Sequence, residues 1–164
     1  MEQKKININT VYVTYQGEVN VRGIGAPVIF LRLQGCHLRC YKETIGCLCD
    51  TPEALDTKIE RNMQTLEDLC EQLCVLKETT GIDFICFTGG DPLYYDKETL
   101  KELFIRLCVL GFTVSVETSG TLDVRPYLLD NVHFVLDYKL LSAGIKASFF
   151  EPNLRAVGKA IVKF

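Results

Sequence analysis

The sequence predicts an α/β fold in which a largely parallel sheet forms an open, incomplete (β/α) barrel. Segments with strand character alternate with helical segments along the 164 residues, which favours parallel strands joined by helical crossovers. About five or six strands are readable, fewer than the eight of a closed barrel. Four unusual motifs each follow a strand, at the end where function gathers in such sheets.

Composition is that of a single globular domain spanning residues 1–164. Hydrophobic residues make up 48% and charged residues 24%, and a chain of this length can bury its own core. The net charge of −3 does not indicate wholesale nucleic-acid binding. The sequence shows neither a signal peptide nor an apolar run long enough for a membrane span, so a cytoplasmic protein is expected.

Strands are expected where β-branched and aromatic residues gather between turn signals. The expected strands are residues 9–17, 28–35, 83–90, 112–120, 133–140 and 158–164. Apolar residues at helical spacing predict a helix over 65–78. A second amphipathic helix is expected over 96–111, with Asp96 as its N-cap and Gly111 as its stop, and a short helix over 123–130.

Eight cysteines are present, and four lie in the loop after residues 28–35, namely Cys36, Cys40, Cys47 and Cys49. In a reducing compartment such a cluster is more often a set of metal ligands or catalytic thiols than disulfides. The spacing lacks the paired knuckles of structural zinc sites, while three thiolates can hold a four-iron cluster with one iron open. The residues alone give zinc and iron–sulfur equal weight.

The other four cysteines are expected in the core, because buried cysteine behaves as a small hydrophobe. They are Cys70, Cys74, Cys86 and Cys108.

Three further motifs are weak signals when each is taken alone. "TGGDP" at 88–92 is either a turn or a place where backbone approaches a ligand, with Asp91 available for a ligand ammonium. "ETSGT" at 117–121 is either a polar turn or a carboxylate with hydroxyls above the sheet. In "TYQGE", Gln16 can both donate and accept, which suits the edge of a heterocycle. Arg32 is either an edge or opposite-face arginine, or it is buried and needs an anionic partner such as a substrate carboxylate.

Taken together, these blocks resemble the 7-carboxy-7-deazaguanine synthase family of radical S-adenosylmethionine enzymes. The resemblance runs in order from Tyr15 to about Leu140, through "YQGE", "GAPVIFLRLQGCHLRC", "CDT", "FTGGDPL", "VETSGT" and "LDYKL". It implies the radical SAM type of open barrel and turns the tie between zinc and iron–sulfur toward a [4Fe–4S] cluster.

The resemblance also implies a reaction, a lyase step in queuosine biosynthesis. The reduced cluster delivers an electron to S-adenosylmethionine, and the resulting 5′-deoxyadenosyl radical takes hydrogen from 6-carboxy-5,6,7,8-tetrahydropterin. The ring contracts, ammonia leaves, and 7-carboxy-7-deazaguanine forms. The protein positions the reacting groups and shields them, while the cofactors carry out the chemistry.

Site residues follow from the resemblance position by position. Cys36, Cys40 and Cys49 match the cluster ligands, and Thr51 matches a residue that helps to hold Mg²⁺. The implied contacts with S-adenosylmethionine are Gly89, Gly90, Asp91, Glu117, Ser119, Asp137, Tyr138 and Lys139. The implied contacts with the pterin are Tyr15, Gln16, Gly17, Glu18, Arg32 and Thr88. An electron donor such as flavodoxin or ferredoxin is expected as a partner and a homodimer as an assembly, without nucleic acid or membrane.

The chain departs from the family pattern in three places. The family spacing is C-x3-C-x2-C, whereas this chain has C-x3-C-x8-C, so Cys47 becomes a rival third ligand. Asp91 stands where glutamate is common. The chain stops at "AIVKF", where the family usually continues, so a truncated or minimal version with a more open site is expected.

Two rival functions remain open. A glycyl-radical-enzyme activase would share the cluster and cofactor but act on a protein, and "QGE" and "CDT" argue against it. A non-catalytic zinc-binding domain with a decayed site would hold about one zinc and no iron.

Overall fold

A seven-stranded sheet with the order β3-β1-β2-β4-β5-β6-β7 organises the molecule. The computed structural model describes residues 3–41, 49–145, 148–156 and 160–163. The strands are β1 Lys5–Tyr15, β2 Pro27–Leu33, β3 Met63–Thr65, β4 Phe84–Gly89, β5 Thr113–Thr118, β6 Val132–Asp137 and β7 Ala160–Lys163. Strands β2, β4, β5, β6 and β7 are parallel to one another, while β1 runs antiparallel to both β2 and β3. The sheet stays open, with β3 and β7 at its edges.

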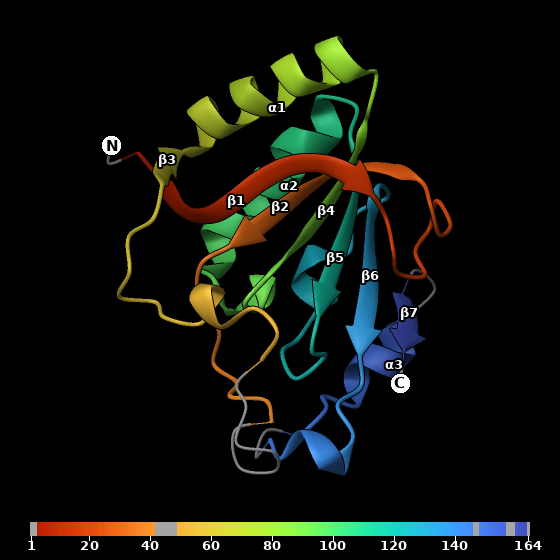
Figure 1. Cartoon of the computed structure of the whole chain (residues 1–164). Helices are drawn as coiled ribbons and strands as arrows, with labels where there is room; N and C mark the ends of the chain where they lie inside the picture. The colour runs from red at the N-terminus through yellow and green to blue at the C-terminus, as the bar shows by residue number, and fades with distance from the viewer. Residues whose placement is uncertain (1–2, 42–48, 146–147, 157–159, 164) are drawn as a thin grey trace.

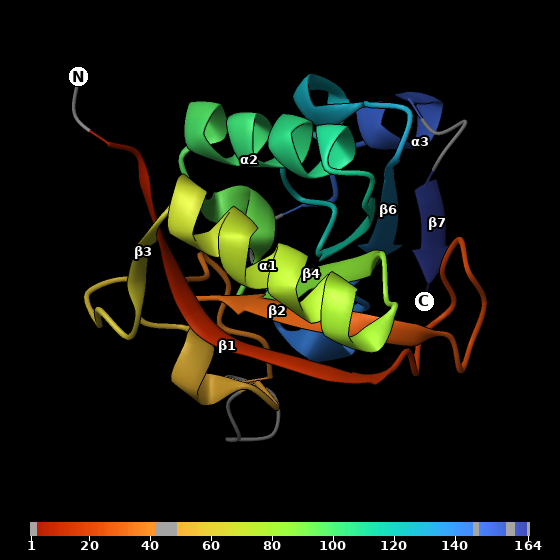
Figure 2. The same cartoon turned by 90° about the horizontal axis from the view of Figure 1, so that it is seen from above.

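Two helices cover one face of this sheet. Helices α1 Leu66–Thr80 and α2 Lys97–Val109 lie on the same side, as Figure 2 shows, and a third helix, α3 Pro152–Ala156, lies beside β7 (Figure 1). Short 3-10 turns form at Pro52–Ala54, Pro92–Tyr94, Arg125–Tyr127 and Leu141–Ala143. The loops that follow β2, β5 and β6 gather at the lower side of the view in Figure 1.

Strand alternation gives the sheet two different faces. Toward the helices, residues such as Leu31, Phe87 and Val116 are fully buried in the main core. Phe104 of α2 packs edge-on against Phe87, with ring centroids 5.1 Å apart. The alternate residues of the same strands include Arg32, Thr88 and Glu117, which line a cavity instead. The helix-free face is therefore the one that carries polar chemistry.

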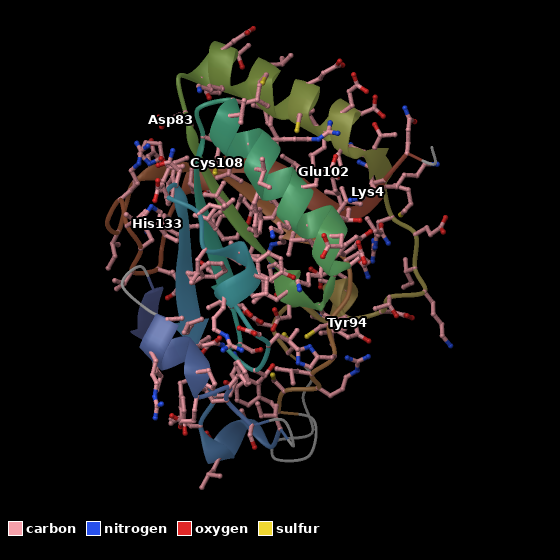
Figure 3. The ribbon with its side chains drawn as sticks, turned by 180° about the vertical axis from the view of Figure 1, so that it is seen from behind. Lys4, Asp83, Tyr94, Glu102, Cys108 and His133 are labelled. Atoms are coloured by element: carbon pink, nitrogen blue, oxygen red, sulfur yellow. The ribbon has the colours of Figure 1, made fainter. Side chains whose placement is uncertain are left out.

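The ion pair between Lys4 and Glu102 joins the start of the sheet to α2. Lys4 Nζ lies 2.9 Å from Glu102 Oε2, and Figure 3 shows the two labelled side chains side by side. Both side chains are partly exposed, so solvent screening keeps the contribution of the pair to stability small. None of the helices in the described ranges has both the length and the apolar character needed to cross a membrane.

The predicted fold class is confirmed, with corrections to individual elements. The first strand begins at Lys5, earlier than predicted, and is antiparallel. The three-residue strand β3 was not predicted, because it exists only as a partner of residues 5–7 of β1. Residues 123–130 contain a single 3-10 turn, Arg125–Tyr127, instead of a helix, because the backbone is already extended at Leu128. Helix α3 was also not predicted.

The cysteines assigned to the core lie there. Cys70 and Cys86 are buried, and Cys74 and Cys108 are partly buried against the main core. Cys86 differs from the other three because it faces the helix-free side, where it packs with Val28 and Phe84.

Asp96 caps α2, and its removal should destabilise the fold. Its carboxylate accepts hydrogen bonds from the Thr99 hydroxyl (2.6 Å) and the Thr99 backbone N–H (2.8 Å), and these bonds lower the pKa of Asp96. A lowered folded-state pKa means that the stabilisation is present above the usual pKa and is lost as pH falls. We expect Asp96→Ala to cost about 1 kcal/mol at neutral pH and less below about pH 3, measured by urea unfolding. Glu71→Ala on α1 is the control, and an equal loss in both variants would contradict a capping role.

Candidate functional site

A cavity of about 380 Å³ lies on the helix-free face and extends to the C-terminal ends of the parallel strands. It brings together most of the residues that the sequence singled out. Its lining includes Tyr15, Gln16, Gly17, Glu18, Arg32, Cys36, Cys40, Cys49, Thr51, Thr88, Gly89, Gly90, Asp91, Glu117, Ser119, Asp137 and Lys139. Tyr138 lines a neighbouring cavity of about 390 Å³, where its ring centroid lies 5.1 Å from that of Phe149. Cys47 lies outside the described residues.

The two limbs of one loop carry Cys36, Cys40 and Cys49. The Gly35 N–H donates to the Ala54 carbonyl (2.7 Å) and the Cys36 N–H donates to the Leu55 carbonyl (3.2 Å), which closes the loop at its base. Cys36 and Cys40 are each 7% exposed and cluster with Leu38 and Leu55. Cys49 is partly buried against the same cluster. The three thiols, which come from the two limbs of the loop, thus lie on one wall of the cavity.

Burial controls the ionisation of these thiols. It raises the pKa of Cys36 to about 11, with the nearby Asp91, Cys40 and Cys49 adding to the rise. Burial also raises the pKa of Cys40 and of Cys49. The three groups are therefore neutral near pH 7 when nothing is bound. Metal binding to such thiols must release protons, because the thiolate is the ligand.

The chemistry of this donor set fits an iron–sulfur cluster. Within the described ranges, no group of three or more His, Cys, Asp or Glu side chains is arranged to hold one metal ion. In a four-iron cluster each cysteine binds a different iron, so the thiols need not converge on one point. Soft sulfur ligands on a partly enclosed wall match that requirement.

A polar group built from "CDT" adjoins the thiols. The Cys49 thiol (3.2 Å) and the Thr51 hydroxyl (3.3 Å) both donate to Asp50 Oδ1. The Cys49 bond lowers the pKa of Asp50, against the effect of burial, and the Thr51 bond adds to the lowering. The oxygens of Asp50 and Thr51 are ligands of the kind that Mg²⁺ prefers.

Arg32 faces the same group from β2, which lies inside the sheet, so it is not an edge residue. Its Nη1 donates to Thr51 Oγ1 (3.1 Å), and its guanidinium carbon lies 5.6 Å from the Phe30 ring centroid. Among the described residues Arg32 has no carboxylate within ion-pair distance. A partly buried cation in that state is suited to an anionic ligand.

Lys139, in contrast, already has a carboxylate partner. It forms an ion pair with Asp137 at the edge of the cavity. Burial favours its neutral form, but the hydrogen bond and charge of Asp137 outweigh burial and raise the pKa of Lys139. Lys139 therefore stays charged near Cys40.

Gln16 and Glu117 form the opposite wall. Gln16 is 1% exposed, and its Nε2 donates to Glu117 Oε1 (3.1 Å) and to Cys86 Sγ (3.3 Å). Its Oε1 accepts from the Glu18 N–H at 3.2 Å. The amide thus already has protein partners on both sides, and its clearest effect is to fix the direction of the Glu117 carboxylate.

The glycine motif packs against the start of the cysteine loop. A Cβ on Gly90 would lie 2.0 Å from the Gly35 carbonyl oxygen, closer than any real contact. Gly89 has φ of +121°, in the region that favours glycine. The Asp91 N–H donates to the same Gly35 oxygen at 3.0 Å. These glycines therefore allow two backbones to meet.

The Asp91 carboxylate is occupied by protein donors. It accepts from the Thr118 hydroxyl (2.7 Å), from the backbone and hydroxyl of Ser119, and from the Leu93 N–H (3.1 Å). The residue is 3% exposed. Its role toward a ligand ammonium stays a prediction, while its contacts join the loops after β4 and β5.

Several lining residues were missed from the sequence. They are Tyr12, Thr14, Phe30, Leu38, Asp50, Leu55 and Thr118. Strand alternation could have found Phe30, which lies two positions before Arg32 and therefore on the same face. Asp50 could have been chosen for its place between a predicted ligand and Thr51.

The chain is similar to curated proteins over most of its length. The chain is 33% identical to a 7-carboxy-7-deazaguanine synthase of Pyrobaculum aerophilum, over 98% of this chain and 66% of that protein. It is 32% identical to one of Leptospira interrogans, over 94% of this chain and 65% of that protein. The chain thus spans about two thirds of the length of these relatives. The search of family models found no match.

Two solved structures share the fold. The crystal structure of QueE from Escherichia coli aligns with a TM-score of 0.70 and 24% identity, covering 96% of this chain and 71% of that one. Streptococcus suis SuiB bound to S-adenosylmethionine aligns with a TM-score of 0.57 and 18% identity, covering 79% of this chain and 31% of that one.

Gly90→Ala should disrupt the junction beneath the site. The added methyl group would collide with backbone at Gly35, which cannot rotate away as a side chain could. We expect a loss of about 3 kcal/mol or more in the free energy of unfolding, measured by denaturant titration. Gly17→Ala is the matched control, because nothing lies within 4 Å of its added Cβ. Similar stability of the two variants would disprove the close approach.

Proposed function

Because the chain belongs to the 7-carboxy-7-deazaguanine synthase family, we propose that it is a radical S-adenosylmethionine lyase. Its substrate would be 6-carboxy-5,6,7,8-tetrahydropterin and its product 7-carboxy-7-deazaguanine, in queuosine biosynthesis. The observation that carries the proposal is the meeting of Cys36, Cys40 and Cys49 around one cavity with Arg32, which has no carboxylate within ion-pair distance among the described residues. A cavity of about 380 Å³ has the size of a small-molecule site.

The thiols of Cys36, Cys40 and Cys49 would hold a [4Fe–4S] cluster. The cluster and S-adenosylmethionine, when bound, supply the one-electron chemistry that begins hydrogen abstraction. The loop ends after β4, β5 and β6 would hold the cofactor through Gly89, Gly90, Asp91, Glu117, Ser119, Asp137, Tyr138 and Lys139. The ion pair between Lys139 and Asp137 would fix both side chains at the edge of the cavity, where they could contact the cofactor.

Arg32 would bind the carboxylate of the pterin. A guanidinium can grip a carboxylate with two parallel hydrogen bonds, and the Phe30 ring behind it restricts its orientation. Thr51, with Asp50 beside it, would hold Mg²⁺ next to that carboxylate. The remaining wall would contact the pterin ring through Tyr15, Gln16, Gly17, Glu18 and Thr88.

The proposed setting is the reducing cytoplasm, with flavodoxin or ferredoxin as electron donor. A homodimer remains a prediction.

Anaerobic cluster reconstitution tests the proposal. The reconstituted chain, given S-adenosylmethionine, dithionite and the pterin, should consume the pterin and release 7-carboxy-7-deazaguanine and ammonia in equal amounts. About four irons per chain are expected. One zinc without iron would instead indicate a scaffold domain, and cofactor cleavage without pterin consumption would indicate an activase.

Arg32→Ala should weaken substrate binding and spare the cluster. Loss of a charge-assisted bidentate contact should raise KM for the pterin by about 10- to 100-fold. The absorbance of the reconstituted cluster should stay unchanged. Arg22→Ala is the matched control, since Arg22 Nη2 lies 3.0 Å from Oδ1 of the partly exposed Asp83. Figure 3 labels Asp83, which lies far from the cysteine loop. An equal loss of cluster and substrate affinity would give Arg32 a structural role.

The third cluster ligand can be identified by two single substitutions. Cys49→Ala should lose both the cluster and the cleavage of S-adenosylmethionine, because Cys49 shares a wall with the other two thiols. Cys47→Ala should keep both. The measurements are iron content and release of 5′-deoxyadenosine after anaerobic reconstitution. A reversed result would make Cys47 the ligand, and retention by both variants would mean that either thiol can serve.

A further inference from the structure

Gln34, the residue after β2, is buried and connects three segments through its side-chain amide. It is 3% exposed. Its Nε2 donates to the carbonyls of Glu53 (2.9 Å) and Asp56 (2.8 Å). Its Oε1 accepts from Asn9 Nδ2 at 2.8 Å, which fixes which end of the amide faces the loop. No role in the proposed reaction accounts for this arrangement.

The segment that Gln34 holds is the returning limb of the cysteine loop. This limb directly follows Cys49 and Thr51, and its only regular element is the 3-10 turn Pro52–Ala54. The Thr51 side chain makes no capping bond to that turn. So short a turn has little stability of its own, and its place depends on contacts made by neighbouring residues. Gln34 supplies two of these contacts, next to the backbone bonds that Gly35 and Cys36 make.

We propose that Gln34 is a positioning residue that keeps Cys49 and Thr51 on the wall shared with Cys36 and Cys40. The link to the cluster rests on the proposed function, whereas the anchoring of residues 53–56 does not. The amide is needed because it offers two donors to the limb and an acceptor to Asn9. A carboxylate of the same shape would place oxygen against both carbonyl oxygens.

Amide hydrogen exchange on the metal-free chain tests the anchoring. In Gln34→Glu, the amides of Gly35 and Cys36 should exchange at least about tenfold faster, because their acceptors lie on the loosened limb. Amides inside α1 and α2 should keep their rates. Gln72→Glu is the matched control, an exposed glutamine on α1 that undergoes the same change and should alter neither set.

Cluster retention tests the link to the thiols. After anaerobic reconstitution, the Gln34→Glu chain should lose its cluster absorbance to an iron chelator at least about tenfold faster than the parent or Gln72→Glu. Asn9→Ala removes the support for the amide and one long hydrogen bond from Asn9 Nδ2 to the Glu53 carbonyl (3.5 Å), and it should show the same local exchange at smaller size. It carries the test if Gln34→Glu fails to fold.

Three results would overturn the proposal. Unchanged exchange at Gly35 and Cys36 would remove the anchor. Faster exchange throughout α1 and α2 as well would mean that Gln34 serves general stability. Faster exchange at Gly35 and Cys36 with an unchanged rate of cluster loss would mean that the position of the limb does not affect the thiols. A parent chain that binds no iron would defeat the proposed function, and the exchange measurement would still decide the anchoring.

Discussion

Three stretches of backbone meet at Gly35 with no space for a side chain, and the site depends on that junction. The Gly35 N–H donates to Ala54, and its carbonyl accepts from the Asp91 N–H. A Cβ on Gly90 would lie 2.0 Å from the same carbonyl. Because these contacts are between backbones, they set the distance between the cysteine loop and the loop after β4 within narrow limits. The Asp91 carboxylate then extends the junction to β5 through Thr118 and Ser119. One crowded point thus determines where three loops present their side chains.

One face of the sheet stabilises the fold, and the other carries the polar groups of the candidate site. The helix-covered face buries aliphatic and aromatic residues, and that burial is the main favourable contribution to folding. The other face can therefore hold Arg32, Glu117 and buried thiols, which are costly to desolvate. Antiparallel β1 adds to this face from the opposite direction. It ends beside the start of β2, and Gln16 reaches Glu117 from there across the face. Crossovers alone would not have brought that residue to the site.

Periodicity in the sequence was enough to predict the parallel strands, α1 and α2, because their residues face one core. It could not predict β3, whose three residues pair only once β1 has its partner. For the site, motif order correctly brought most residues to one cavity, although Tyr138 lines the neighbouring one. Asp50 and Gln34 were missed because their importance comes from contacts made after folding. Asp50 receives the Cys49 and Thr51 hydrogen bonds, and Gln34 receives and makes bonds across 25 and 22 positions of sequence.

Charge in the cavity explains why the thiol wall is suited to a metal cluster. Among the described lining residues, the carboxylates are those of Glu18, Asp50, Asp91, Glu117 and Asp137, while the cations are those of Arg32 and Lys139. Lys139 is committed to Asp137, and Arg32 lies beside Thr51. Three thiolates added to this set would have little positive charge to offset them, and burial indeed holds the pKa of Cys36 at about 11. A bound cluster containing iron cations would supply that charge at the thiols themselves, and Arg32 would then be available for the proposed anionic substrate. On that proposal the cavity has a metal side and a substrate side, with Thr51 between them.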